Sequence, residues 1–160
     1  MTRDLFARDV MRKNVVSLTP SATLQEARDI FLQHKINGVP VVSEDNTLLG
    51  VISQTDLVRV LVSRGIDEMV DDSSYVGMVG WGAHGSEAQG VVGDRIKSLC
   101  VSDLMSANVF TASPDDSVSL LARNMRLHNI HRIVITERGK VVGLVTSMDM
   151  LRIIEGDGEY

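Results

Sequence analysis

One short motif occurs twice in this chain of 160 residues, and its repetition restricts the fold more than any other feature. The first copy, G-V-I-S-Q-T-D, covers residues 50–56, and the second, G-L-V-T-S-M-D, covers residues 143–149. In each copy a Gly and two aliphatic residues precede a hydroxyl side chain, and an Asp follows three residues later. An apolar segment with helical character comes after each Asp. The motif therefore predicts, twice, a short buried strand that ends in a polar turn at the start of a helix.

The motif belongs to a longer internal repeat. The D-V-M of residues 9–11 recurs as D-L-M at residues 103–105, an offset of 94 residues (103 − 9). Three further matches share this offset: Val15 with Val109, Pro20 with Pro114, and Ile36 with Ile130. At the motif the offset falls to 93 (143 − 50), as expected if one surface turn is a residue shorter in the second copy. Two such copies are predicted to pack together as a pseudo-symmetric pair.

Each copy is predicted to have the order β-α-β-β-α. In copy one, a strand at residues 15–18 precedes a helix that Thr23 and Glu26 start as a capping box. The apolar face of this helix has helical spacing and consists of Leu24, Ala27 and Phe31. We expect Gly38 to end the helix.

The second half of copy one is predicted to be a hairpin followed by a helix. Its first strand, residues 39–42, contains Pro40, which favours an edge or strand-start position. Its second strand, residues 48–53, is a near-continuous apolar run suited to a strand covered on both faces. The helix is expected to begin at Asp56 or Leu57 and to stop near Gly65.

Copy two repeats this order. Its first helix has an equivalent apolar face, consisting of Val118, Leu121 and Met125. A strand follows at residues 133–136, and the next turn contains Arg138 and Gly139. Between the copies, residues 67–98 form a Gly-rich insertion without periodicity, which we predict to be a loop. This loop is either a linker or a flap over a ligand cleft or a second subunit, and no phosphate-binding loop pattern occurs in it.

Composition narrows the class of protein. The net charge of −5 and the pI of about 5.3 argue against nonspecific binding to nucleic acid or to anionic membranes. The single Cys100 cannot form an internal disulfide and fits a reducing compartment. No apolar run approaches the roughly 20 residues of a membrane helix, and the N-terminus lacks the apolar core of a signal peptide. We therefore predict a cytoplasmic protein.

The chain resembles a tandem cystathionine-β-synthase-type (CBS) domain pair, or Bateman module. The doubled motif carries most of this resemblance. The repeated openings D-V-M and D-L-M and the segments I-N-G-V-P-V-V and I-H-R-I-V-I-T add to it. The resemblance covers nearly all of both copies. It implies an α/β (α+β) fold in which two pseudo-symmetric β-α-β-β-α repeats pack sheet to sheet into one module. The implied domains are repeat one at residues 1–66, the insertion at 67–98 and repeat two at 99–160.

The resemblance also implies a function. Such modules hold AMP, ADP, ATP or sometimes S-adenosylmethionine in clefts between the paired repeats, and they regulate a partner protein. In this chain the two Asp residues of the motif would bind ribose hydroxyls, the hydroxyl residues would bind ribose or phosphate, and the segments before the strands would hold adenine. The implied ligand-binding residues are Ile36, Gly38, Val39, Ser53, Thr55, Asp56, Ile130, His131, Arg132, Ile133, Thr146 and Asp149. Modules of this kind commonly pair as flat discs, so the resemblance implies a homodimer.

The residue chemistry agrees with these roles but leaves alternatives open. A carboxylate accepts hydrogen bonds from a vicinal diol, and helix N-termini and Arg favour phosphate. Asp, Ser and Thr before a helix are also ordinary N-caps. Met148 stands where copy one has Thr55, and Asn37-Gly38 replaces His131-Arg132, so the sequence predicts two unequal sites.

Three rival functions remain at this point. The chain could be a ligand-free dimerisation scaffold, a sensor of S-adenosylmethionine or NAD, or a nucleic-acid binder, which the net charge disfavours. The histidines show no metal-ligand spacing, so no metal site is expected. No nucleophile elbow or Cys–His pairing stands out, so we do not expect an enzyme.

Overall fold

The structure is a computed structural model that describes residues 5–63 and 98–156. Almost all of the predicted insertion, residues 67–98, therefore lies outside the described residues. The chain forms two compact units. The first contains the described parts of residues 1–20, 39–51 and 106–160, and the second contains those of residues 21–38 and 52–105.

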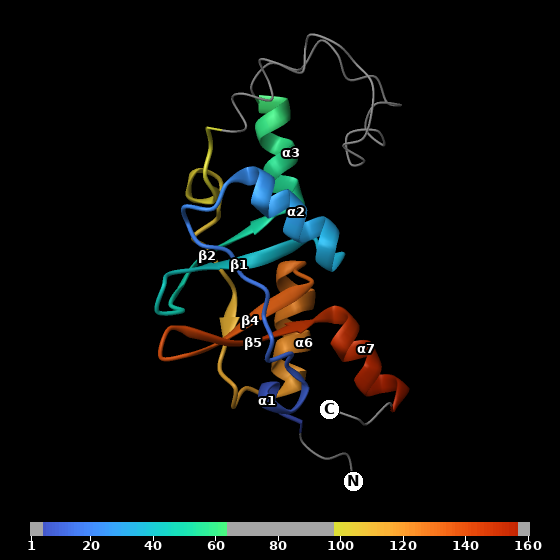
Figure 1. Cartoon of the computed structure of the whole chain (residues 1–160). Coiled ribbons are helices and arrows are strands. Elements are labelled where there is room, and N and C mark those ends of the chain that lie inside the picture. The colour runs from blue at the N-terminus through green and yellow to red at the C-terminus, as the bar shows by residue number, and fades with distance from the viewer. Residues whose placement is uncertain (1–4, 64–97, 157–160) are drawn as a thin grey trace, which may run out of the picture. The chain divides into compact units, whose positions relative to one another are not determined.

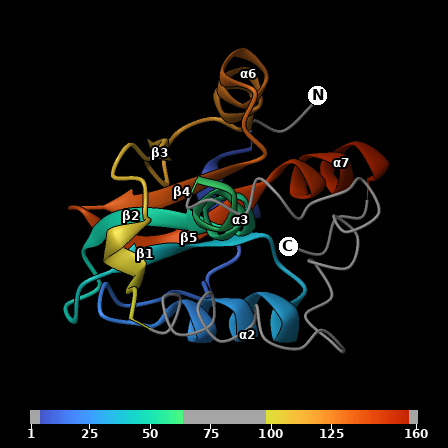
Figure 2. The ribbon, with the colours of Figure 1, turned by 90° about the horizontal axis from the view of Figure 1, so that it is seen from above.

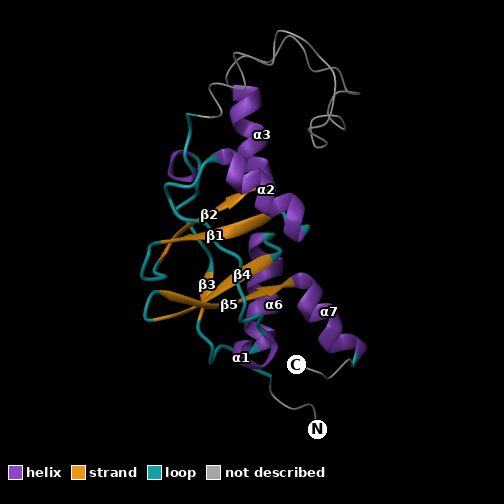
Figure 3. Ribbon diagram, viewed as in Figure 1, coloured by secondary structure: helices purple, strands orange, loops and turns teal. Residues whose placement is uncertain are grey.

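A three-stranded sheet is the centre of the first unit (Figures 1 and 3). Strand β3 (Thr111–Ala112) runs parallel to β4 (Arg132–Glu137), and β4 pairs antiparallel with β5 (Lys140–Thr146). The β4–β5 turn contains Arg138 and Gly139 as predicted, and both residues have positive φ. The register places Arg132 opposite Thr146, so the start of β4 lies beside the end of β5.

Three helices cover one face of this sheet, as Figure 2 shows for α6. They are α1 (Ala7–Val10), α6 (Val118–His128) and α7 (Ser147–Glu155). Helix α6 is capped at its start by Ser117, whose side chain accepts a hydrogen bond from the Leu120 amide at 3.2 Å. The core under the helices is apolar and consists of Ala7, Val10, Ala112, Leu121, Met125, Ile133, Ile135 and Val145. Two of the predicted face residues, Leu121 and Met125, are therefore confirmed as core, and Val118 packs against it half-buried.

A second sheet consists of β1 (Gly38–Val42) and β2 (Leu48–Ser53). Within the first unit, Val42 packs with Val134 and Val141 in a second apolar cluster. The turn between β1 and β2 also pairs with the turn of the other hairpin: the amides of Leu48 and Val141 donate to Gly139 O and Asn46 O at 2.9 and 3.1 Å. The prediction that β2 is covered on both faces is wrong, because Leu49 in this strand is 38% exposed.

The second unit contains α2 (Leu24–His34), α3 (Gln54–Ser63) and the short 3-10 helix η1 (Val101–Asp103). The predicted capping box forms, since the Thr23 amide donates to Glu26 Oε2 at 2.7 Å and the Glu26 amide donates to Thr23 Oγ1 at 3.2 Å. The pKa of Glu26 is lowered by these hydrogen bonds from Thr23. The buried apolar residues of this unit are Ala22, Leu24, Ala27, Phe31, Ile52, Val60 and Val101. They include the whole predicted face of α2.

The opening segment of each copy packs against the other copy. The Ala7 amide at the start of α1 donates to Asp116 O at 2.8 Å, next to α6 of copy two. In return, the Val101 amide at the start of η1 donates to Ala22 O of copy one at 2.8 Å. Ala7 and Val101 stand two residues before the repeated D-V-M and D-L-M, so the openings of the two copies make equivalent contacts with the opposite copy.

Several elements differ from the prediction, of which β4 differs least, since it extends one residue beyond each end of the predicted 133–136. Of residues 15–18, only Leu18 forms a β-bridge, with Val41, so no strand exists there. Helix α2 ends at His34 because Lys35 takes the left-handed conformation with φ of 52°, and Gly38 belongs to β1 instead. Helix α3 begins at Gln54, two residues before Asp56. Its predicted end near Gly65 lies outside the described residues.

Candidate functional site

The polar turn of copy two is built by a reciprocal helix cap. Strand β5 ends at Thr146, whose side chain accepts a hydrogen bond from the Asp149 amide at 3.3 Å. In the other direction, the amide and the hydroxyl of Thr146 both donate to Oδ2 of Asp149, at 2.8 and 2.6 Å. The spacing of three residues in the motif is thus the spacing of a capping box, with Asp in the position usually held by Glu.

Asp149 has a second partner from far away in the sequence. It is 4% exposed, and its Oδ1 accepts hydrogen bonds from Nε and Nη2 of Arg12 at 3.0 and 2.9 Å. Nη1 of Arg152 lies 3.6 Å from the same oxygen. Burial acts to raise the pKa of Asp149, but the hydrogen bonds from Thr146 and Arg12 outweigh it and leave the pKa below its ordinary value. Asp149 is therefore held as a carboxylate.

The polar turn of copy one is similar in its cap and different in its second partner. The amide and hydroxyl of Ser53 donate to Oδ2 of Asp56 at 2.8 and 2.6 Å. Oδ1 of Asp56 accepts no hydrogen bond from any described residue, and Nη1 of Arg59 lies 3.8 Å from it. The Asp56 side chain is 17% exposed, compared with 5% for Asp149. Among the described residues, Oδ1 of Asp56 is thus less engaged than Oδ1 of Asp149.

Each polar turn lies beside the segment that precedes the first strand of the hairpin in its own copy. In copy one the Gln54 amide donates to Asn37 O at 3.0 Å, and Gln54 Nε2 donates to Ile36 O at 3.3 Å. In copy two the Ser147 amide donates to His131 O at 2.9 Å. Because the same backbone contact occurs in both copies, the structure brings together the two groups of predicted residues within each copy.

The remaining predicted residues differ in exposure. Gly38, Val39 and Ile133 are buried in strands, and Ile36 and Ile130 are half-buried just before those strands. Thr55 and His131 are exposed. Arg132 is half-buried, and this burial lowers the pKa of its guanidinium. The ligand roles of all these residues stay predictions.

Sequence reasoning missed two residues of this region. Gln54 ties the polar turn of copy one to the segment at Ile36, although its side chain has no counterpart in Ser147. Arg12 contacts Asp149 across 137 positions of the chain. The available signal for Arg12 was its place directly after the repeated D-V-M, where the second copy has Ser106.

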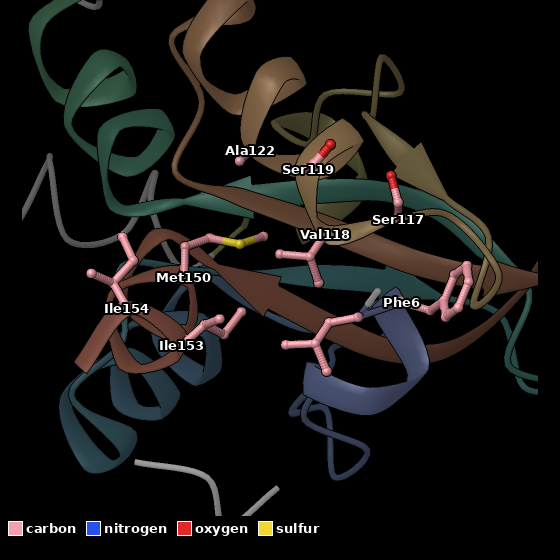
Figure 4. Close-up of a pocket in the computed structure, with 9 residues that line it drawn as sticks. Phe6, Ser117, Val118, Ser119, Ala122, Met150, Ile153 and Ile154 are labelled. Atoms are coloured by element: carbon pink, nitrogen blue, oxygen red, sulfur yellow. The ribbon is translucent and has the colours of Figure 1, made fainter. Parts of the chain in front are cut away.

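An open apolar groove of about 590 Å³ lies on the helical side of the first unit. Figure 4 shows Val118, Met150 and Ile153 converging on this groove from α6 and α7. It is lined by Leu5, Phe6, Ser117, Val118, Ser119, Ala122, Met150, Ile153 and Ile154. None of the predicted ligand-binding residues lines it. The groove is therefore a separate surface from the polar turns.

Two further kinds of site were sought in the described residues. No group of three or more His, Cys, Asp or Glu side chains in residues 5–63 and 98–156 could hold a metal ion. Within the same ranges, no helix combines the length and the apolar character that crossing a bilayer requires.

Comparison with known proteins identifies the family. The family model for the CBS domain matches residues 7–63 and 101–156, which together make up most of the chain. The chain belongs to the CBS-domain family and carries two CBS repeats in tandem, a Bateman module. The predicted fold class, a mixed α/β fold of two CBS repeats, is thereby confirmed.

Solved structures share this fold. The CBS domain pair of protein MJ0100, in complex with 5′-methylthioadenosine and S-adenosyl-L-methionine, matches with a TM-score of 0.69 at 24% identity, over 97% of this chain and 99% of that one. CBSX2 in complex with AMP matches with a TM-score of 0.70 at 21% identity, over 95% of this chain and 97% of that one.

Curated relatives are of mixed kind. An uncharacterized protein of Methanocaldococcus jannaschii, MJ1225, is 25% identical over 96% of this chain, which spans only 44% of that relative. Homoserine O-acetyltransferases of methanogenic archaea also match, and the chain spans 23 to 25% of their length. The chain is thus similar to solved CBS-pair structures along nearly its whole length, and it spans less than half of MJ1225 and about a quarter of the enzymes.

Proposed function

We propose that this chain is a regulatory module that binds an adenosine-containing ligand of the AMP, ADP or ATP type and signals the state of that ligand pool to a partner protein. The observation that carries the proposal is the carboxylate of Asp56. Its Oδ2 is used by the helix cap, whereas its Oδ1 accepts no hydrogen bond from the described residues, the side chain is 17% exposed, and Nη1 of Arg59 lies 3.8 Å away.

The chemistry of Asp56 suits a ribose. An ionised carboxylate only accepts hydrogen bonds, and Oδ1 has two lone pairs for the two hydroxyls of a vicinal diol. Because the cap holds Oδ2 through two short bonds, the carboxylate is fixed in place before a ligand arrives. Gln54 contacts the backbone of Ile36, and the buried Gly38 and Val39 follow Ile36 in the chain. This segment offers apolar and backbone groups to a flat base.

The structural neighbours support the ligand class. One was solved with 5′-methylthioadenosine and S-adenosyl-L-methionine and another with AMP, so all three ligands carry an adenosine. We propose an adenine nucleotide for this chain because Arg132 and the helix N-termini at Gln54 and Ser147 favour a phosphate. We propose regulation and not catalysis because the two carboxylates, Asp56 and Asp149, occur one in each repeat, as binding groups would.

A thermal-shift panel tests the proposal. Protein stripped of carried-over ligand is heated with AMP, ADP, ATP, NAD, S-adenosylmethionine and, as a control, GTP. A ligand at a hundred times its dissociation constant stabilises the folded state by about 2.7 kcal/mol, which is easily detected. We expect a shift with an adenine nucleotide that Asp56→Ala abolishes.

Asp103→Ala is the matched control. Asp103 accepts a hydrogen bond from the Cys100 amide at 2.8 Å in the same three-residue geometry, but it is not among the predicted ligand residues. This variant is expected to keep the ligand shift. A flat panel would favour the scaffold function, in which Asp56→Ala changes only cap stability, by about 1 kcal/mol. A response to S-adenosylmethionine or NAD alone would favour the alternative sensor.

We also infer that the module forms a homodimer through the apolar groove. Ile154 lines the edge of the groove and is 80% exposed. The same surface therefore contains both a hollow and a protruding apolar side chain. A two-fold symmetric contact uses the same patch on both partners, and such a patch is self-complementary when knob and hollow adjoin. Exposed apolar surface of this kind is typical of interaction sites.

Sedimentation velocity tests this dimer. Ile154→Glu places a charge in the apolar contact and is expected to shift the protein to monomer. Leu49→Glu, at a 38% exposed position of β2 away from the groove residues, is expected to leave the dimer intact. A wild-type monomer at high protein concentration would rule the dimer out.

A further inference from the structure

We infer that Arg12 is a specificity-determining residue that competes with ligand for Asp149, so that the copy-two site binds ribose ligands more weakly than the copy-one site and fills second. This inference rests on the proposed function and adds to it the order in which the two sites fill. The doubled motif alone predicts two ribose carboxylates. Among the described residues, one of them keeps an oxygen that accepts no hydrogen bond, and the other is engaged by a side chain distant in the sequence.

The hydrogen-bonding capacity of Asp149 is fully used. A carboxylate has about four lone-pair sites, two on each oxygen. Both sites of Oδ2 accept from Thr146, and both sites of Oδ1 accept from Arg12. A ribose hydroxyl can therefore reach Asp149 only by displacing a guanidinium donor. A charge-assisted hydrogen bond is stronger than the neutral hydroxyl bond that would replace it.

The backbone holds Arg12 at this position. The Arg12 amide donates to Leu144 O at 2.9 Å, and the Leu144 amide donates to Arg12 O at 3.1 Å. This bridge pairs the backbone of Arg12 with Leu144 of β5, which is five residues before Asp149. The backbone of Arg12 is thereby fixed at a position from which its guanidinium reaches the Asp149 carboxylate. The Arg12 side chain is 53% exposed, and it can therefore swing into water when a ligand displaces it. Displacement weakens binding without abolishing it.

Copy one is an internal control for this effect. The residue equivalent to Arg12 is Ser106, which forms the equivalent bridge, with both bonds to Val51 at 2.9 Å. A serine hydroxyl carries no charge and cannot form a guanidinium pair. The second arginine near each carboxylate does not differ, because Arg59 and Arg152 occupy matching positions at 3.8 and 3.6 Å. Arg12 is thus the feature that distinguishes the partners of Asp149 from those of Asp56.

The test isolates the copy-two site by removing the copy-one carboxylate. AMP and S-adenosylmethionine are titrated by isothermal calorimetry into wild type, Asp56→Ala, and Asp56→Ala combined with Arg12→Ser, which copies the serine of the other repeat. The double variant is expected to bind at least about tenfold more tightly than Asp56→Ala, since losing one charge-assisted bond changes affinity by about that factor. Adding Asp149→Asn is expected to remove the gain.

Two controls exclude other causes. Arg8→Ser removes an arginine from the same segment that pairs with Asp115 and not with Asp149, and it is expected to change nothing. Arg12→Lys keeps the charge but offers a single donor group, so an intermediate affinity is expected, and this variant keeps the test decisive if Arg12→Ser does not fold.

Three outcomes would overturn the inference. If wild type binds through Asp56 but neither Arg12 variant gains affinity, the competition does not exist and the proposed function stands. If Arg12→Ser and Arg12→Lys both weaken binding, Arg12 contacts the ligand instead. If no protein binds either probe and the thermal-shift panel is also flat with ADP and ATP, the proposed function fails and the inference fails with it.

Discussion

The backbone of Gly143 lies directly against the side chain of Met11, so closely that a methyl group added at Gly143 would come within 2.8 Å of Met11 Cγ. Gly143 is the first residue of the second motif, and Met11 ends the first D-V-M. Two separate repeat signals in the sequence therefore meet at one contact. A side chain at position 143 would fit only if the Met11 side chain moved away from β5.

Gly143→Ala is expected to destabilise the protein by about 1 to 3 kcal/mol, the range for overpacking a filled site. Urea unfolding at neutral pH measures this change. Since the clash is with Met11, the double variant with Met11→Ala should lose less than the sum of the two single variants. Additive losses would show that the contact with Met11 does not explain the Gly.

Thr146→Ala is expected to destabilise the protein by about 1 to 3 kcal/mol, because it removes the cap of α7 and one donor to a buried carboxylate oxygen. Thr146→Ser keeps the hydroxyl, which is the arrangement found naturally at Ser53 in copy one, and should lose less than half as much. Denaturant midpoints of the two variants decide the question. Equal losses would assign the effect to the methyl group instead of the hydrogen bonds.

The stability supplied by Asp149 is expected to decline in acid. Its pKa in the folded protein lies below the ordinary value of 3.8, so the unfolded chain takes up the proton first as the pH falls. The contribution of the carboxylate is therefore complete above about pH 5 and disappears as the pH falls through the folded pKa. Urea unfolding of wild type and Asp149→Asn between pH 7 and pH 3 should show a stability difference that narrows on acidification. If the stability difference between wild type and Asp149→Asn stayed constant with pH, the ionised carboxylate would not be its source.

The sequence predicted those features whose causes lie within a few residues. The start of α2 was correct because Thr23 and Glu26 form their capping box locally. Its end was wrong because Lys35 adopts a left-handed conformation that sequence patterns attribute to Gly or Asn. The predicted start of α3, at Asp56 or Leu57, is two or three residues too late, because Asp56 accepts the hydrogen bond from the Ser53 amide from inside the first turn of the helix.

Long-range contacts were beyond this kind of prediction. The repeat offsets correctly indicated two copies of one unit, yet they could not show that residues 9–11 pack against copy two. For the same reason Arg12 was overlooked: its partner Asp149 is 137 positions away, and no local period links the two. The inequality of the two sites was predicted from Met148 and Thr55, while the structure shows a further inequality in the partners of the carboxylates.

Asn46 is expected to hold the two hairpin turns together. Its side-chain amide donates to Val141 O at 2.8 Å, and its backbone has a φ of 67°, a left-handed conformation that Asn tolerates better than most residues. Asn46→Ala loses the hydrogen bond and strains the backbone, so a loss of about 1 to 3 kcal/mol is expected. Asn46→Gly loses the hydrogen bond but relieves the strain, and should be less destabilised than Asn46→Ala in urea unfolding. If the Gly variant were as unstable as the Ala variant, the left-handed backbone would contribute nothing and the side-chain bond to Val141 would carry the whole effect.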